Sequence, residues 1–137
     1  MNPLLHITVV DVDPAFLRLE VRAASTRFAG TARIYAGLGQ LDALASLLEG
    51  FPNARGDRRQ FAFGDEENGH VALLFHCEEA AGSATVHVTL QDDDQFHDPA
   101  AASFRFSVEP AEIDRFQVRL RALEQARSGE ALLSGVD

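Results

Sequence analysis

Three short segments decide the fold of this chain: HVALLFHC at residues 70–77, ATVHVTL at 84–90 and SFRFSV at 103–108. In each segment apolar and polar residues alternate with a period of two, which is typical of a strand with one buried face. The segments follow one another between Gly69 and Val108. They therefore predict three consecutive strands of an antiparallel sheet.

The rest of the chain adds strands before this stretch and two helices. Further strands are expected at residues 4–12, 17–23, 28–36 and 59–63. The leucines of residues 38–49 recur at spacings of three and four, which indicates an amphipathic helix. Gly50 suits the left-handed position after that helix, and Pro52 prevents its continuation. A second helix is expected over residues 110–127, because Pro110 suits a first helical position.

The order of these elements predicts an α+β domain. We expect a single antiparallel, meander-like sheet of about six to seven strands with two amphipathic helices packed on it. The 137 residues are enough for one domain with its own core. Residues 130–137 are expected to form a frayed tail.

Charge and composition narrow the classes of partner. The net charge of −9 disfavours nucleic acid, because phosphates are neutralised by basic patches, and it suits a basic protein partner. The single cysteine, Cys77, rules out an internal disulfide and is expected in the core beside Leu73 and Phe75. The first residues carry no signal-peptide pattern, and no window reaches the roughly 20 apolar residues of a membrane helix. We therefore expect a cytoplasmic protein without membrane contact.

No sequence pattern in the chain specifies a reaction. The sequence lacks a P-loop, a Gly-x-Ser-x-Gly nucleophile turn, a His-Glu-x-x-His zinc motif and a dinucleotide-binding fingerprint. We therefore expect a non-enzymatic protein that uses no cofactor and no metal.

Two connections of the predicted meander are strongly acidic. Alternate connections of an antiparallel meander emerge at the same end of the sheet, so residues 65–68 and 91–98 are expected side by side. Together they would form an acidic rim with Phe96 as an apolar anchor for a cationic partner. The predicted rim consists of Asp65, Glu66, Glu67, Asp92, Asp93, Asp94, Phe96 and Asp98.

Two histidines on neighbouring predicted strands, His76 and His87, share the outer face. A turn centred on residues 82–83 places His76 opposite Thr89, and a turn one step earlier places His76 directly opposite His87. Both registers keep the imidazoles within reach of one another. Glu78 is a candidate third ligand, but a zinc site needs three or four. A metal-dependent enzyme using this face is therefore kept only as an alternative.

One family resemblance accompanies these patterns. One pattern is similar to the WapI-type immunity proteins of bacterial polymorphic toxin systems. It consists of Phe28-Ala29-Gly30, then Tyr35, then the leucine-spaced helix ending in residues 48–52 (LEGFP). The late helix with its apolar stripe fits the same layout. The resemblance implies a non-enzymatic cytoplasmic protein that binds and blocks a cognate toxin, and it implies no catalytic residues.

The leading hypothesis is thus a small bacterial binding protein, immunity-like, that neutralises a basic toxin through its acidic rim. A homodimer is a second hypothesis, because an edge strand of the sheet could pair with a second copy and the open face carries Ala72 and Leu74. The third is the metal or enzymatic use of His76 and His87.

Overall fold

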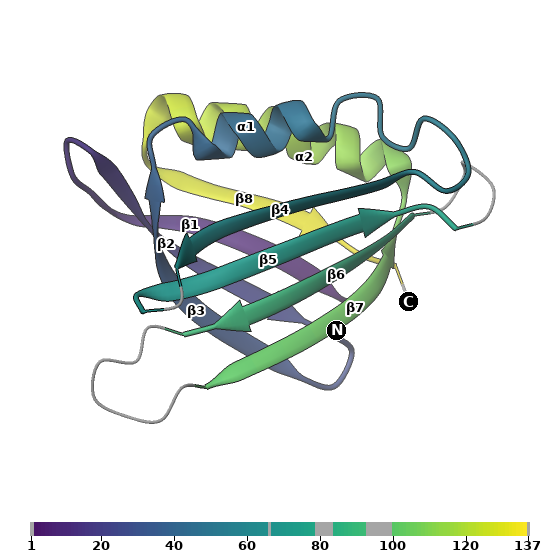
Figure 1. Cartoon of the computed structure of the whole chain (residues 1–137), viewed down its shortest axis with the longest axis horizontal. Coiled ribbons are helices and arrows are strands. Elements are labelled where there is room, and N and C mark those ends of the chain that lie inside the picture. Colours follow the sequence, from purple (N-terminus) through teal and green to yellow (C-terminus); the bar gives the residue numbers. More distant parts are fainter. Residues whose placement is uncertain (1, 66, 79–83, 93–99, 137) are drawn as a thin grey trace.

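The computed structural model describes residues 2–65, 67–78, 84–92 and 100–136. These residues form eight strands and two α-helices (Figure 1). The helices are α1 (Gln40–Leu47) and α2 (Pro110–Ala126). The strands are β1 (Leu4–Val12), β2 (Phe16–Ala24), β3 (Ala29–Gly37), β4 (Arg58–Asp65), β5 (Gly69–His76), β6 (Ala84–Gln91), β7 (Ala101–Val108) and β8 (Gly129–Ser134).

The strands divide into two antiparallel sheets of four. One sheet has the order β3-β2-β1-β8 and the other the order β4-β5-β6-β7. The α+β class and the antiparallel pairing are confirmed, but the prediction of a single sheet is wrong. Period-two alternation shows which side chains of a strand face a core, and it carries no information on which sheet the strand joins. Here the apolar faces of two smaller sheets are buried against each other.

The core lies between these two sheets. Across it β3 contacts β4, β5 and β6, and β2 contacts β6. Burying one large apolar side chain contributes about 1.5–3 kcal/mol, so this layer supplies much of the driving force for folding. Its fully buried members include Leu19, Val21 and Ile34 of the first sheet and Phe63, Phe75 and Val86 of the second.

The two helices cover one open side of the sandwich rather than a sheet face. They pack on each other, while α2 contacts the edge strand β8 and α1 contacts the edge strand β4 (Figure 1). Gly50 has a φ of 71°, the left-handed conformation that its position in the sequence predicts, and lies two residues after the C-cap of α1, Leu48. Arg59 of β4 donates to the carbonyls of Leu47 and Glu49 at 2.8 and 2.7 Å, which fixes the end of α1. The outer faces of both sheets therefore stay open.

The last residues belong to the fold. Residues 129–134 form β8, which pairs with β1 from Leu4↔Ser134 to Val9↔Gly129. Beyond it the amide of Val136 donates to the carbonyl of Ser107 in β7. The prediction of a frayed tail over residues 130–137 is therefore wrong, because Ala131 and Leu133 are buried and complete the first sheet.

Residues 58–108 form the predicted antiparallel meander. Strands β4, β5, β6 and β7 are neighbours in chain order, and each pairs antiparallel with the next. The β4–β5 and β6–β7 connections therefore leave the sheet at the same end, on the left of Figure 1. The hairpin between β1 and β2 lies at this end of the molecule as well, and we call it the hairpin end (Figure 1).

Candidate functional site

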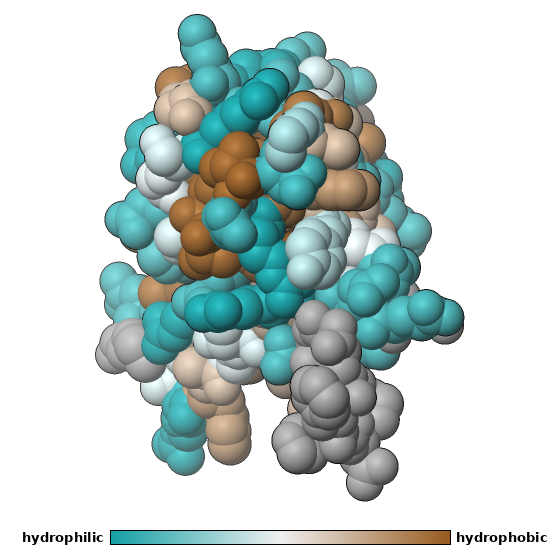
Figure 2. Space-filling model, turned by 90° about the vertical axis from the view of Figure 1, so that its left-hand side faces the viewer, coloured by the Kyte–Doolittle hydropathy of each residue, from teal (hydrophilic) through white to brown (hydrophobic). Residues whose placement is uncertain are grey.

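The hairpin end combines apolar and polar surface. Figure 2 views the molecule from this side and shows apolar side chains gathered over part of it, with hydrophilic residues around them. An exposed apolar cluster with a polar border is the usual anatomy of a protein-binding surface. The hairpin end is therefore the first candidate site.

Four exposed side chains form the apolar part, which we call the hairpin patch: Val10, Val12, Phe16 and Tyr35. Each is between 41% and 48% exposed, and all four line one shallow depression of about 470 Å³. The rings of Phe16 and Tyr35 meet edge to face with their centroids 6.3 Å apart. Aromatic side chains of this kind supply most of the binding energy in protein interfaces.

Local backbone features explain why these side chains stay exposed. The pairing of β1 with β2 shifts between Val9 and Asp11, which leaves Val10 as the extra residue of a β-bulge. The hairpin then turns at Asp13, whose amide donates to the carbonyl of Phe16 at 2.9 Å. Phe16 and Tyr35 are exposed because they lie on the outer face of the sheet with Arg18, whereas their strand neighbours Leu17 and Ala36 point into the core.

Charged residues surround the hairpin patch. Asp11 and Asp13 line the same depression, and each also fixes the hairpin by accepting a backbone hydrogen bond, from Val12 and Ala15 respectively. Two arginines are present too. The guanidinium of Arg18 lies 4.1 Å from the centre of the Tyr35 ring, and Arg33 pairs with Glu20 at 3.2 Å. Arg18 and Arg33 thus interact with Tyr35 and Glu20 of the sheet, while the carboxylates of Asp11 and Asp13 lie at the turn of the hairpin.

The structure places three residues of the predicted acidic rim: Asp65, Glu67 and Asp92. Asp65 accepts hydrogen bonds from the amides of Glu67 and Asn68, and the Asn68 bond is the main reason why the pKa of Asp65 lies below its usual value. Glu67 is exposed. The others, Glu66, Asp93, Asp94, Phe96 and Asp98, lie outside the described residues.

Asp92 connects the rim to the other sheet. Its Oδ1 accepts a hydrogen bond of 3.1 Å from the backbone amide of Arg33 in β3. Arg33 also lines the depression of the hairpin patch. Asp92 is therefore tied to the strand that carries Tyr35, close to the hairpin patch.

No protein-family model, no curated protein and no solved structure matches this chain. The resemblance to WapI-type immunity proteins therefore stays a prediction. Among the described residues, no helix is long and apolar enough to cross a membrane.

A second candidate site lies on the outer face of the β4–β7 sheet. The Nε2 atoms of His76 and His87 are 2.9 Å apart, so one imidazole donates a hydrogen bond to the other. The predicted proximity of the two rings is confirmed, but both predicted registers are wrong. Leu74 pairs with His87 and His76 with Thr85, which makes the histidines diagonal neighbours.

This histidine pair has positively charged neighbours. Arg58 of β4 is the direct cross-strand partner of His76, and Arg105 of β7 is that of His87. The pKa of His87 is lowered, first by burial and then by the charges of His76, Arg105 and Arg58. Glu78 opposes this effect, and its Oε1 lies 3.5 Å from Nδ1 of His76. In the described part of the chain no three potential ligands are grouped for a metal ion.

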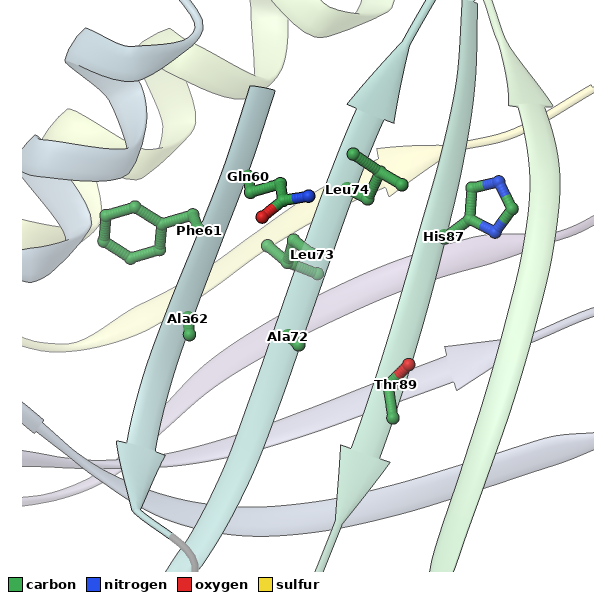
Figure 3. A pocket seen from close by; sticks show the side chains of 8 residues that line it. All are labelled: Gln60, Phe61, Ala62, Ala72, Leu73, Leu74, His87 and Thr89. Carbon is green, nitrogen blue, oxygen red and sulfur yellow. The ribbon is translucent and has the colours of Figure 1, made fainter. Parts of the chain in front are cut away.

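A depression of about 580 Å³ adjoins His87 on the same face. Figure 3 shows its lining side chains spread over β4, β5 and β6, with His87 and Thr89 on one side and Gln60 on the other. Its floor is apolar, made by Ala62, Ala72 and Leu74. Cys77 contributes to neither site, because it is 1% exposed and faces the core as predicted.

Two contributors to these sites escaped the sequence analysis. Phe16 was left out of the second strand because only the alternation from Leu17 onwards marks it. Arg58 precedes the strand expected at residues 59–63, and its place beside His76 depends on the β4–β5 register. One signal in the sequence could have found Phe16. It has the same parity as Arg18 and Glu20, which extends the second strand by one residue.

Proposed function

We propose that this chain is a non-enzymatic binding protein that engages a basic protein through its hairpin end. The observation that supports this most is the exposed hairpin patch beside acidic connections, in a chain of net charge −9. The specific form we propose is that of an immunity protein, which blocks a cognate toxin.

The two parts of the surface have different tasks in this proposal. Phe16 and Tyr35 supply the apolar contacts that slow dissociation, because buried aromatic anchors dominate the energetics of interfaces. Asp11, Glu67 and Asp92 attract a cationic surface and raise the association rate, most strongly at low ionic strength. The apolar anchor predicted at Phe96 is thereby joined by two aromatic residues that the structure describes.

In this proposal the chain neutralises the toxin by occupying the surface that binds the toxin's substrate. A toxin that acts on an anionic substrate carries a positive surface around its site, and the carboxylates of the hairpin end would occupy that surface in place of the substrate. The residues of the hairpin patch belong to the paired strands β1, β2 and β3, so little backbone ordering is required of them on binding. No chemical step by this chain is needed.

The test is a capture experiment with purified protein and lysate of the source bacterium at about 50 mM and about 300 mM salt, because salt screens surface charges over this range. We expect one basic protein to be retained at low salt, and Phe16→Ala with Tyr35→Ala to reduce its retention at least about tenfold. Val118→Ala is the matched control, since Val118 is 70% exposed on α2.

Equal retention by the patch variant and the control would contradict the proposal. A retained protein without excess positive charge, or retention insensitive to salt, would contradict the electrostatic part. Charge reversal at Glu67→Lys separates the two parts, because it is expected to slow association while leaving dissociation nearly unchanged.

A further inference from the structure

The histidine pair belongs to a row of cationic side chains that crosses all four strands of its sheet. Direct cross-strand partners point to the same face, which places Arg58 beside His76 and Arg105 beside His87. The two histidines connect these halves through the 2.9 Å contact of their Nε2 atoms. Four basic side chains from β4, β5, β6 and β7 thus lie on the outer side of this sheet, where Arg58 and Arg105 are exposed, His87 is half-buried and His76 is only 5% exposed beneath them.

Five arginines elsewhere in the described chain are neutralised by carboxylates. Arg33, Arg59, Arg115, Arg119 and Arg121 form ion pairs with carboxylates. Within the described ranges, no carboxylate pairs with the guanidinium of Arg58 or Arg105. Among the described carboxylates, Glu78 contacts the row, but it is largely exposed and approaches His76 at Nδ1, away from the contact with His87.

The charges decide which kind of ligand fits. A divalent cation at the two Nε2 atoms would be repelled by both arginines, and it would find two ligands where zinc needs three or four. An anion is attracted by the arginines, and each guanidinium presents several donors to a carboxylate. Protonation of the imidazoles adds further positive charge.

The neighbouring depression adds a second requirement. Its floor of Ala62, Ala72 and Leu74 starts beside His87, and Leu74 is the cross-strand partner of that histidine. Figure 3 shows these three side chains in a band that leads away from the imidazole across β5 to β4. A ligand with its anionic group at the arginines would lay an apolar body along this band.

We propose that the outer face of β4–β7 binds a small amphiphilic carboxylate, with its anionic head among Arg58, His76, His87 and Arg105. The apolar body lies over Ala62, Ala72 and Leu74. This site is on a sheet face and does not depend on the function proposed for the hairpin end.

The proposal predicts how binding changes with pH. The groups that face the histidines are Arg58 from β4, Glu78 after β5 and Arg105 from β7. Protonation of His87 strengthens the attraction for the head group. Because burial and the neighbouring positive charges hold the pKa of His87 below its usual 6.5, affinity is expected to rise at least about threefold between pH 7.5 and pH 5.5.

The test titrates the whole protein with octanoate and, separately, with acetate. Binding is monitored through the ring signals of the two histidines in NMR spectra. We expect saturable octanoate binding that shifts the signals of His76 and His87, and acetate binding at least about tenfold weaker. Arg105→Gln and Arg58→Gln should each weaken octanoate at least about fivefold. Arg22→Gln, on the outer face of the other sheet, is the control and should change it less than about twofold.

Three outcomes would overturn the proposal. Equal affinity for acetate and octanoate would show that the apolar band does not contribute to binding. Unchanged octanoate binding in both arginine variants would show that the arginines do not hold the anionic head. Stoichiometric zinc binding that shifts the same ring signals would show that the pair serves a cation. A retained far-ultraviolet circular dichroism spectrum in each variant shows that loss of binding is local.

Discussion

At the scale of single residues, Glu112 is the most consequential charge in the structure. It is 7% exposed in the first turn of α2 and accepts hydrogen bonds from the Ser134 amide at 2.8 Å and from Arg115 at 2.9 Å. Burial alone would raise its pKa, but the bonds from Ser134, Arg115 and Arg119 hold that pKa below the usual 4.5. Glu112 thus joins α2 to β8 through a buried carboxylate.

Glu112→Gln is expected to lower the free energy of unfolding by about 2 kcal/mol at pH 7, because a charged acceptor is lost from a buried position. A lowered folded-state pKa stabilises the fold above the unfolded value of 4.5 and ceases to do so as pH falls through the folded value. The variant and the wild type should therefore converge in urea unfolding below that pH. Glu109→Gln, at an exposed position, is the control, and an equal loss there would contradict this role.

His87 gives the second prediction at this scale. Its pKa lies below the usual 6.5 because of burial first, and then because of His76, Arg105 and Arg58. A lowered pKa means that the folded state resists protonation, so stability declines as pH falls through 6.5 towards the folded value. Arg105→Gln should raise the pKa of His87, measured by NMR titration, whereas Arg22→Gln should not. A His87 pKa above 6.5 in the wild type would refute the electrostatic account.

At the scale of elements, β8 carries a prediction that distinguishes a strand from a tail. Leu133 is fully buried and its neighbour Leu132 is 36% exposed on the opposite face. Leu133→Ala should lower the free energy of unfolding by about 2–5 kcal/mol, because it leaves a cavity in the core. Leu132→Ala should cost less than about 1 kcal/mol. Similar small losses in urea denaturation for both variants would mean that β8 contributes little to the fold.

Sequence patterns identified single strands and helices better than they identified which strands pair into which sheet. The alternation at Val71, Leu73 and Phe75 was long enough to mark β5 and its inward face. Residues 129–134 were missed because Leu132 and Leu133 are consecutive apolar residues in a short segment, which blurs a period of two. The split into two sheets was missed because it depends on contacts such as those of β3 with β5, which are remote in sequence.

At the scale of the whole molecule, contacts within the chain occupy backbone groups on two sheet edges. Asp92 occupies the amide of Arg33 on the edge strand β3, and Val136 occupies a carbonyl of the edge strand β7. The remaining edges, β4 and β8, lie beside the helices. Capped edges of this kind oppose pairing with a second chain.

Asp92→Ala should therefore increase any dimer fraction, because it frees a backbone donor on β3. Light scattering coupled to size-exclusion chromatography measures this, and Glu67→Ala is a matched control that removes an exposed charge from the neighbouring β4–β5 turn. An equal rise in both variants would indicate lost charge repulsion instead of a freed edge.

The candidate sites were accessible from sequence only in part. The meander correctly gathered two acidic connections at one end, because that follows from strand order alone. The outward direction of Phe16 and Tyr35 follows from their parity with Arg18 and Arg33, but the contact of the two rings required the register of β2 with β3. The meeting of His76 and His87 followed from parity, but their diagonal contact required the register of β5 with β6.

The start of β1 and the end of β8 lie side by side, away from the hairpin end (Figure 1). The amide of Gly135 donates to the carbonyl of Pro3 at 2.8 Å, and a side chain at Gly135 would overlap the ring of Phe106. A peptide linker of a few residues between these ends would thus close the backbone into a circle with little distortion of the native state. The circular chain loses disorder when unfolded, so it should melt at a higher temperature while leaving both binding surfaces unobstructed.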